Sequence, residues 1–427
     1  MPKLVKGQTL EALADPFAVP PTEAFRHRRR GGVLVDEGGR ILAVDEAEAL
    51  EPHADTVTDH GDALILPGFI DAHMHYPQTR IIASWGKRLI DWLEGYTFPE
   101  EARFGDPAHA AAVAGDSLDL ALAHGTTTLC SYATIHPGSV DAFFTAAQAR
   151  GMRALAGKTC MDRNAPENLR DTAQSAFDDS KRLLDRWHGV DRLGYVITPR
   201  FAPTSTEAQM EALGALWAAH PDCLMQTHLS EQVEEIAWVR DLYPWARDYL
   251  DVYERFGLLG ARGVYGHAIH LEPREIDRLA EVGAGLAHCP TSNTFIGSGC
   301  MAVASLRMRG IGVGLATDTG GGSSFSMLRT MGAAYEVGQL AGTALHPAQL
   351  LWLATAGSAR VLHLSDRIGT LATGMEADLC VLDLASTPAI AQRAARADDI
   401  WDAVFPTIMM GDDRAVTATY IGGTARA

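Results

Sequence analysis

Two histidines that stand two positions apart, His73 and His75, close an apolar run that begins near Leu66. Residues two apart on a strand point to the same face, so both imidazoles can reach one site. Neutral imidazole is a good ligand for zinc or iron. A single His-x-His pair is weak evidence, because the pattern also occurs by chance in polar strands. A metal site therefore needs further ligands from elsewhere in the chain.

Further candidates are His228, His267 and Asp318, each of which ends another apolar run. Taken singly, each could be a polar residue that closes a strand and satisfies a backbone group. Three histidines and a carboxylate, however, make a metal site with a position left open for water. The metal would lower the pKa of that water from about 16 toward 7 and supply hydroxide at neutral pH. His267 could ligate the metal or hydrogen-bond the hydroxide, and the sequence leaves both roles open.

Hydrolysis at such a site also needs a group that gives and takes protons, and Glu231 is placed for this. It lies three residues past His228, where the chain can turn over the site. A carboxyl group in a closed pocket tends toward a raised pKa. The alternative is a carboxylate at a helix N-terminus, stabilised by the helix dipole. We expect Glu231, His267 and Asp318 to be catalytic, with Asp318 able to accept a proton from the water.

Eight β-rich runs alternate with Ala- and Leu-rich helical stretches such as 108–124 and 205–219, between about residues 66 and 370. This alternation predicts a (β/α)8 barrel, in which active sites collect at the C-terminal ends of the strands. The expected strand ends lie near His75, Tyr132, Met161, Pro203, His228, His267, Cys289 and Asp318.

The two ends of the chain are rich in strand signals. A hairpin is expected over 32–44, around a Glu37-Gly38-Gly39 turn, and further strands over 378–383 and 415–421. We therefore predict a small β-sandwich-like domain built from both termini. The expected divisions are 1–66 and 371–427 for the small domain and 67–370 for a barrel of the metal-dependent hydrolase type.

A single divalent metal is expected. A lysine at the fourth strand could have carried a bridging carbamate for two metals, but the run Ile197–Pro203 has no lysine. Lys158 ends the third strand instead. His288, at the seventh strand, is expected to pack near the site or to support its ligands rather than to bind the metal.

The chain has 427 residues, 47% of them hydrophobic, and a formal net charge of −17. So acidic a protein repels nucleic acid unless a basic patch is concentrated somewhere. The dense basic run, Arg26–Arg30, is short and is expected to lie on a solvated strand edge. A membrane span and a secretory signal are not expected. The six cysteines form no Cys-x-x-Cys pair, which favours a soluble cytoplasmic protein.

Seven segments stand out for their likeness to one known family: PGFIDAHMHYPQ (67–78), WLEGYTFP (92–99), Arg103-Phe104, TPRFAP (198–203), HLSE (228–231), HCPTSN (288–293) and TDTGG (317–321). They resemble the guanine deaminases of the amidohydrolase superfamily, and the likeness covers most of the chain. The His-x-His and Thr-Asp elements mark only the superfamily, whereas Gln78, the Tyr-Thr-Phe-Pro element and the Pro-Arg-Phe element look specific to guanine deaminases. The loop after Asp318, Thr319–Ser324, differs in some relatives, so the resemblance leaves the fine substrate preference of this loop open.

The resemblance implies hydrolysis of guanine to xanthine and ammonia, with zinc (or Fe²⁺) and in a homodimer. It implies that the metal ligands are His73, His75, His228 and Asp318, and that Glu231 transfers protons. The substrate contacts that it implies are His75, Tyr76, Pro77, Gln78, Arg200, Phe201, His228, Glu231 and Asp318. These types suit a purine: a guanidinium donates to O6, an amide both donates and accepts, and a phenyl face covers the ring.

Two other functions stay open. A sister deaminase or hydrolase acting on another amino-purine, a pyrimidine or a triazine would keep the metal ligands and change the pocket. A non-catalytic scaffold protein would have lost ligands or the acid, and here all are present. The segment Ile81–Phe104 either covers the pocket or is an ordinary buried helix with a surface loop.

Overall fold

A nearly closed barrel of eight parallel strands forms the centre of the protein. The computed structural model describes residues 1–86 and 88–426. Almost every position on these strands is buried, as expected for a parallel sheet covered by helices. In sheet order from one end, the strands are β5 (Phe69–His75), β6 (Thr126–Tyr132), β7 (Arg153–Gly157), β9 (Leu193–Pro199), β10 (Leu224–Leu229), β11 (Gly263–His267), β12 (Gly285–His288) and β13 (Gly312–Leu315).

The predicted (β/α)8 fold is confirmed, with small differences at the strand ends. The third strand ends at Gly157, and a separate two-residue strand, β8 (Thr159–Cys160), pairs with β9. The eighth strand ends at Leu315, before the backbone of Asp318 enters the left-handed region with φ 48°. A strand ladder cannot continue through such a turn.

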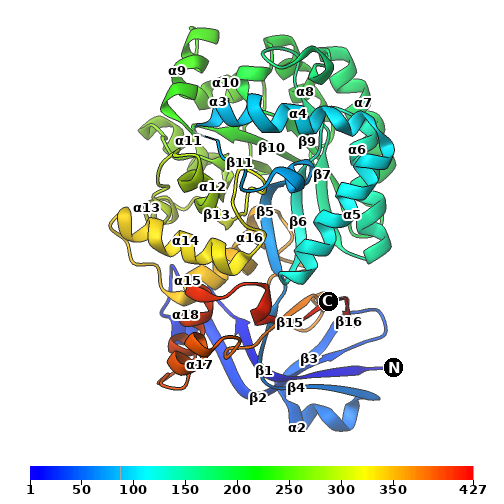
Figure 1. The fold of residues 1–427 in the computed structure, drawn as a ribbon, viewed down its shortest axis with the longest axis vertical. Helices are drawn as coiled ribbons and strands as arrows, with labels where there is room; N and C mark the ends of the chain where they lie inside the picture. The colour runs from blue at the N-terminus through cyan, green and yellow to red at the C-terminus, as the bar shows by residue number, and fades with distance from the viewer. Residues whose placement is uncertain (87, 427) are drawn as a thin grey trace.

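Helices surround the barrel, as Figure 1 shows. The expected helices over 108–124 and 205–219 are α5 (Pro107–Ala123) and α8 (Glu207–Ala219), and the side chains of Asp106 and Thr206 cap their first turns. No helix in the described part of the chain combines the length and apolar character that crossing a bilayer requires. The other main helices are α6 (Pro137–Arg150), α7 (Ala173–Trp187), α9 (Val233–Leu242), α10 (Tyr249–Arg255), α11 (Pro273–Val282), α12 (Pro290–Phe295), α13 (Val303–Met308), α14 (Met327–Leu340) and α15 (Pro347–Trp352).

The two termini join in one seven-stranded sheet at one end of the barrel (Figure 1). The expected hairpin is the antiparallel pair β2–β3, and β14 pairs with β4 and β15. The domain boundaries at 66/67 and 370/371 stay predictions. In sheet order the strands are β16 (Thr424–Ala425), β15 (Val416–Ile421), β14 (Leu379–Leu382), β4 (Thr56–Pro67), β1 (Lys3–Ala12), β2 (Phe25–Val35) and β3 (Ile41–Glu46), with α17 (Pro388–Ala394) and α18 (Ile400–Met410) beside them.

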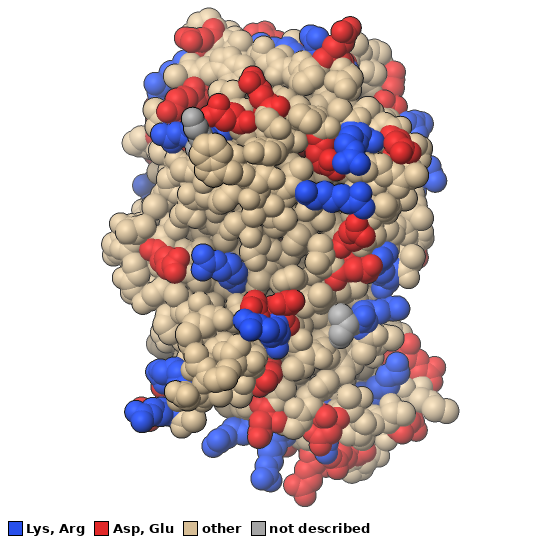
Figure 2. All heavy atoms as spheres, in the orientation of Figure 1, with Lys and Arg blue, Asp and Glu red and all other residues tan. Residues whose placement is uncertain are grey.

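Charged side chains of both signs are interspersed on the face that Figure 2 shows. The basic groups described there do not gather in one patch, although the protein is acidic overall. This distribution gives no electrostatic footprint for a polyanion on that face.

A buried ion cluster joins the barrel to the segment that leads back into the terminal sheet. The carboxylate of Glu376 accepts hydrogen bonds from Arg153 Nε at 3.1 Å and from Arg192 Nε at 3.0 Å. Arg192 also pairs with Asp378, the residue before β14. Burial alone would raise the pKa of Glu376, but the hydrogen bond from Arg153 and the two guanidinium charges hold that pKa below its usual value.

Replacing Glu376 by Gln should destabilise the protein at neutral pH. Because the buried Arg153 loses its carboxylate partner and the partly buried Arg192 keeps only Asp378, we expect the free energy of unfolding to fall by about 3 kcal/mol. A carboxyl group whose pKa is lowered on folding stabilises the protein above its unfolded-state pKa, and this contribution is lost as the pH falls through the folded-state pKa. The difference between wild type and variant in denaturant unfolding should therefore shrink in acid.

The exposed pair Arg150–Asp119 provides a matched control. The Asp119→Asn variant should change the free energy of unfolding by less than about 1 kcal/mol, since solvent screens such pairs. An effect of Glu376→Gln as small as that of the control would contradict the assigned role of the cluster.

Candidate active site

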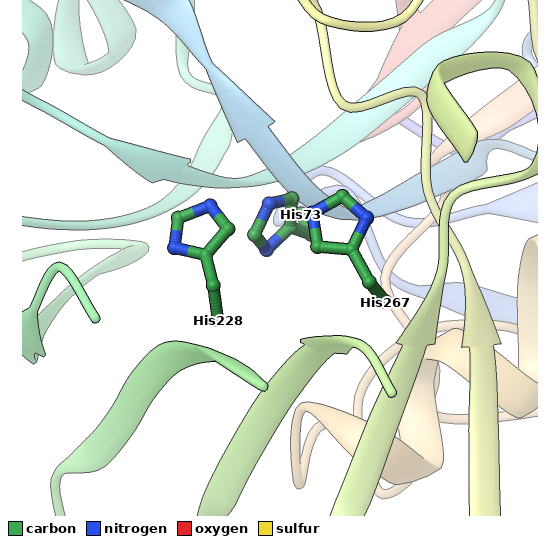
Figure 3. A group of neighbouring side chains, drawn as sticks. All are labelled: His73, His228 and His267. Atoms are coloured by element: carbon green, nitrogen blue, oxygen red, sulfur yellow. The ribbon is translucent and has the colours of Figure 1, made fainter. Parts of the chain in front are cut away.

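Imidazoles from three barrel strands converge with one carboxylate at the C-terminal mouth of the barrel. His73 and His75 come from β5, His228 from β10 and His267 from β11, and Figure 3 shows three of these rings facing a common centre. The Nε2 atoms of His75 and His228 are 3.1 Å apart, and Asp318 Oδ1 lies 3.3 Å from His73 Nε2. Two overlapping groups have potential ligand atoms within 4.8 Å of one another: His73, His228 and His267, and His73, His75 and Asp318.

The hydrogen bonds behind the rings leave their inner nitrogens free to ligate. Nδ1 of His228 lies 2.7 Å from the carbonyl oxygen of Arg200, which can only accept, so Nδ1 carries the proton and Nε2 presents a lone pair. Nδ1 of His267 lies 2.8 Å from Oδ1 of Asn293 and is fixed in the same way. Partners of this kind commonly orient metal-binding histidines. Nitrogen lone pairs that face one another at such short distances repel, and a cation bound between them would turn this repulsion into attraction.

Burial sets the charge state of this centre. It lowers the pKa of His73, His75 and His228, so these rings are neutral and can act as ligands at neutral pH. Burial alone would raise the pKa of Asp318, but the hydrogen bond with His73 and the neighbouring imidazoles lower it strongly. Neutral imidazoles beside one ionised carboxylate are a donor set for a divalent metal.

The backbone is strained where two of these side chains leave it. His267 has φ 66° and Asp318 has φ 48°, values that residues other than glycine rarely adopt. Such conformations cost of the order of 1–3 kcal/mol each and cluster at functional sites. Here they turn the chain at the ends of β11 and β13 so that both side chains enter the mouth.

Glu231 faces the same centre. Its Oε2 lies 3.5 Å from His267 Nε2, and its Oε1 accepts a hydrogen bond of 2.9 Å from the Ser298 hydroxyl. Burial raises the pKa of Glu231 to about 7, so it can hold or release a proton near neutral pH. At the N-terminus of the next helix, α9, Gln232 and Glu235 form a capping box, and the Glu235 carboxylate accepts from the backbone nitrogens of Glu231 and Gln232. Glu231 lies before this helix and directs its carboxyl group to His267 and Ser298, which favours proton transfer over stabilisation by the helix dipole.

A pocket opens directly onto these groups. Gln78, Arg200 and Phe201, which the sequence predicts to contact the substrate, form part of its wall. Neither Tyr76 nor Pro77 is among the described residues that line the pocket. The hydroxyl of Tyr76 instead donates to the Ser139 carbonyl at 2.6 Å. Contacts of Tyr76 and Pro77 with the substrate stay predictions. The full lining is His75, Gln78, Leu89, Trp92, Leu93, Arg200, Phe201, His228, Glu231, His267, Ile296, Asp318 and Gly321.

The segment after β5 contributes an apolar wall to this pocket. Its short helix α3 (Leu89–Trp92) and the following turn of π-helix, η3 (Leu93–Thr97), supply Leu89, Trp92 and Leu93. Of the two interpretations of Ile81–Phe104, the structure thus favours a cover, although Lys87 within it lies outside the described residues. Apolar side chains over a reaction centre exclude water and strengthen the electrostatic interactions inside.

Three residues that sequence reasoning did not single out support the predicted ones. Asn293 holds His267, Ser298 holds Glu231, and Glu101 binds both Gln78 and Arg200. Asn293 lies in the HCPTSN segment already noted for its likeness, which was a usable signal. Glu101 follows the Tyr-Thr-Phe-Pro element, but a second glutamate, Glu100, stands beside it, and the sequence does not distinguish them.

Other candidates lie outside the centre. Lys158 is buried and pairs with Asp171 at 2.5 Å, which accounts for its position without a metal. His288 is buried on β12, and burial lowers its pKa to about 3, consistent with a packing role. A further group, His188, Asp222 and Cys223, lies before the starts of β9 and β10, away from the strand ends that hold the centre. His188 Nδ1 already accepts from the backbone nitrogen of Tyr195 at 3.2 Å, and we assign no metal there.

The fold and the convergent histidines define a metal-dependent hydrolase barrel, and comparison with known proteins agrees. Residues 64–426 match the model of the amidohydrolase family, and the chain belongs to that family. It is 44% identical to the guanine deaminase of Escherichia coli (strain K12) over 395 residues, which are 92% of this chain and 90% of that protein.

Solved structures agree with this relationship. The structure of E. coli guanine deaminase superposes with a TM-score of 0.96 and 40% identity, covering 100% of this chain and 99% of the other. The structure of a guanine deaminase from C. acetobutylicum with bound guanine in the active site has a TM-score of 0.91 and 26% identity, covering 100% of both chains.

Replacing Asn293 by Ala should impair the centre while leaving the fold intact. Without the Asn293 carbonyl, the His267 ring can adopt either tautomer, and we expect kcat/KM to fall about 10- to 100-fold, as for other groups that support metal-site histidines. Elemental analysis of the purified variant would also show whether His267 ligates the metal. If it does, the loss of its hydrogen bond to Asn293 should lower the metal content of the protein. Unchanged activity would contradict the assigned role of Asn293.

Proposed function

We propose that this protein is a guanine deaminase that hydrolyses guanine to xanthine and ammonia. It is a hydrolase of the amidohydrolase family that acts on carbon–nitrogen bonds. The observation that carries the proposal is that Gln78, Arg200 and Phe201 line one pocket with Glu231 and the histidine cluster. Groups suited to a purine edge and face thus lie beside a proton-transfer carboxyl group. The similarity to guanine deaminases along nearly the whole chain supports the same substrate.

One divalent metal, zinc or else Fe²⁺, would be held by His73, His75, His228 and Asp318. Their buried, neutral imidazoles and single carboxylate suit such an ion. When bound, it would supply an activated water as the nucleophile at neutral pH. His267 lies between Glu231 and Asp318, at 3.5 Å and 3.8 Å from their carboxylate oxygens, and we assign it to hydrogen bonding with that water.

The protein's side chains position guanine and move protons. The Arg200 guanidinium donates to O6, Gln78 bonds along the purine edge and the Phe201 ring covers one face. Water adds its oxygen to C2, and the bond from C2 to the exocyclic nitrogen breaks. As the water attacks, Asp318 accepts one of its protons and Glu231 delivers its own proton to ring N3. Glu231 then takes the proton of the new C2 hydroxyl as the carbonyl forms and passes it to the departing amine. The proton held by Asp318 returns to Glu231, so both carboxyl groups end in their starting states. The products are xanthine and ammonia, so one water is consumed for each guanine.

We further propose that the protein forms a homodimer and is located in the cytoplasm. The dimer follows from the family resemblance. The cytoplasmic location rests on the cysteines, all six of which are unpaired and five of which are buried. Light scattering on the purified protein tests the first point, and fractionation of the source cells tests the second.

Guanine should be the preferred substrate of the metal-loaded protein. We expect kcat/KM for guanine to exceed that for adenine, cytosine and amino-triazines by at least about 100-fold, because hydrogen-bonded pocket groups reject analogues that leave them unpaired. Ultraviolet spectra and ammonia release measure both reactant and product, and chelation of the metal should abolish turnover. Comparable turnover of another base would favour the sister-enzyme alternative, and turnover of none would favour the scaffold.

Replacing Glu231 by Gln should remove the proton transfer and keep the metal. The side chain stays nearly isosteric, so metal content should match wild type while kcat falls by about 10²- to 10⁴-fold. A variant with normal metal content and full activity would exclude Glu231 from the mechanism. The neighbouring Glu234→Gln, on the first turn of α9, is the control and should keep wild-type kcat.

A further inference from the structure

We propose that Glu101 is a positioning residue that presets Gln78 and Arg200 for a neutral heterocycle. The proposal rests on the proposed function and adds a residue, and a reason for substrate choice, that the pocket lining does not contain. Glu101 belongs to α4 (Phe98–Glu101), which follows the apolar turns α3 and η3 within the segment that covers the pocket. Its side chain is 1% exposed, and it lies behind the pocket wall rather than in it.

Glu101 makes three hydrogen bonds to the two polar substrate contacts. Its Oε2 accepts from Arg200 Nη1 at 2.7 Å, and its Oε1 accepts from Arg200 Nη2 at 3.1 Å. The same Oε1 accepts from Gln78 Nε2 at 3.0 Å. A bidentate arginine–carboxylate pair fixes the plane of the guanidinium as well as its position. One buried carboxylate therefore orients both groups at once.

These contacts decide which atoms face the substrate. Because Gln78 Nε2 is bound to Glu101, the amide cannot flip freely, and its Oε1 is held 3.4 Å from the backbone nitrogen of Gly320. Arg200 has donors left over after its two bonds to Glu101 and also lies over the Phe98 ring at 5.7 Å. Without Glu101, the side chains of Gln78 and Arg200 would be free to move in the empty pocket. They would then have to become ordered when the substrate binds, and the entropy cost of that ordering would weaken binding.

Glu101 also cancels the charge of Arg200. A buried guanidinium without a partner would attract anions strongly in a site from which water is excluded. Paired with Glu101, Arg200 acts instead as a hydrogen-bond donor of little net charge. The pocket then favours a neutral base such as guanine over an anionic purine, and it does not hold an acidic product tightly.

The adjacent Glu100 offers a matched control. It is also buried on α4, but its carboxylate pairs with His109 at 2.9 Å and Arg103 at 2.8 Å, away from Gln78 and Arg200. A Glu100→Gln variant removes the same charge from the same helical turn. Its fold, metal content and KM for guanine should stay near those of wild type.

The first experiment compares the kinetics of wild type, Glu101→Gln, Glu101→Asp and Glu100→Gln. For Glu101→Gln we expect KM to rise about 10- to 100-fold with a smaller change in kcat, because ground-state contacts are lost. Glu101→Asp keeps the charge and should recover part of the loss. Metal content and thermal midpoint are recorded for each variant. A KM for Glu101→Gln equal to wild type would overturn the proposal.

The second experiment measures charge selection directly, by calorimetric binding of hypoxanthine, which is neutral, and urate, which is an anion. Wild type should prefer hypoxanthine, and Glu101→Gln should shift the ratio of the two affinities toward urate by about tenfold or more. An unchanged ratio would overturn charge compensation. If Glu101→Gln fails to fold, the double variant Glu101→Gln/Arg200→Gln removes the whole pair, and its ratio should then equal that of Arg200→Gln alone.

A ligand-free measurement separates this proposal from the choice of guanine as substrate. The Arg200 guanidinium N–H signals, assigned by their loss in Arg200→Lys, should exchange slowly with solvent in wild type and Glu100→Gln and rapidly in Glu101→Gln. If wild type fails to deaminate guanine, the proposed function falls, while this signal still decides whether Glu101 holds Arg200. Slow exchange that persists in Glu101→Gln would overturn the positioning role.

Discussion

The junction between the first and last barrel strands is the constraint on which the site depends. Just beyond β13, the backbone nitrogen of Asp318 donates to the carbonyl of His73 at 3.0 Å, and the nitrogen of His75 donates to the carbonyl of Thr319 at 2.6 Å. Asp71 reinforces the junction, since its carboxylate accepts from the Thr317 backbone nitrogen at 3.0 Å. The same bonds that close the barrel therefore set the distance between His73, His75 and Asp318.

Dehydration of this mouth determines how its groups behave. Burial lowers the pKa of His73, His75 and His228 and raises that of Glu231. The centre consequently holds neutral ligands beside a carboxyl group that can exchange a proton near neutral pH. In water, glutamate titrates near 4.3 and would be ionised at neutral pH, and histidine, which titrates near 6.5, would be a mixture of neutral and charged forms. The burial of these side chains at the strand ends therefore helps to set the protonation states that the reaction needs.

Sequence reasoning located the strand-end residues because strand periodicity and the barrel rule confine them to one place. His73, His75, His228, His267 and Asp318 all meet there, as expected. Groups that act through other side chains carry no such signal: nothing in the local pattern separates Glu101 from Glu100, yet they face different partners. The strand ends at Gly157 and Leu315 also escaped prediction, because they depend on neighbours distant in sequence.

Gln78 and its partner Glu101 are anchored differently from the candidate metal ligands, and this difference bears on specificity. The candidate metal ligands stand at the ends of β5, β10 and β13, whose positions the barrel closure fixes. Gln78 and Glu101 instead stand on short helical turns, η2 (Tyr76–Ile81) and α4, within the connection that follows β5. Such connections tolerate change better than the strands they join. Substitutions there can alter which heterocycle is held, and with what charge, while the histidine cluster and its proton-transfer partner stay in place.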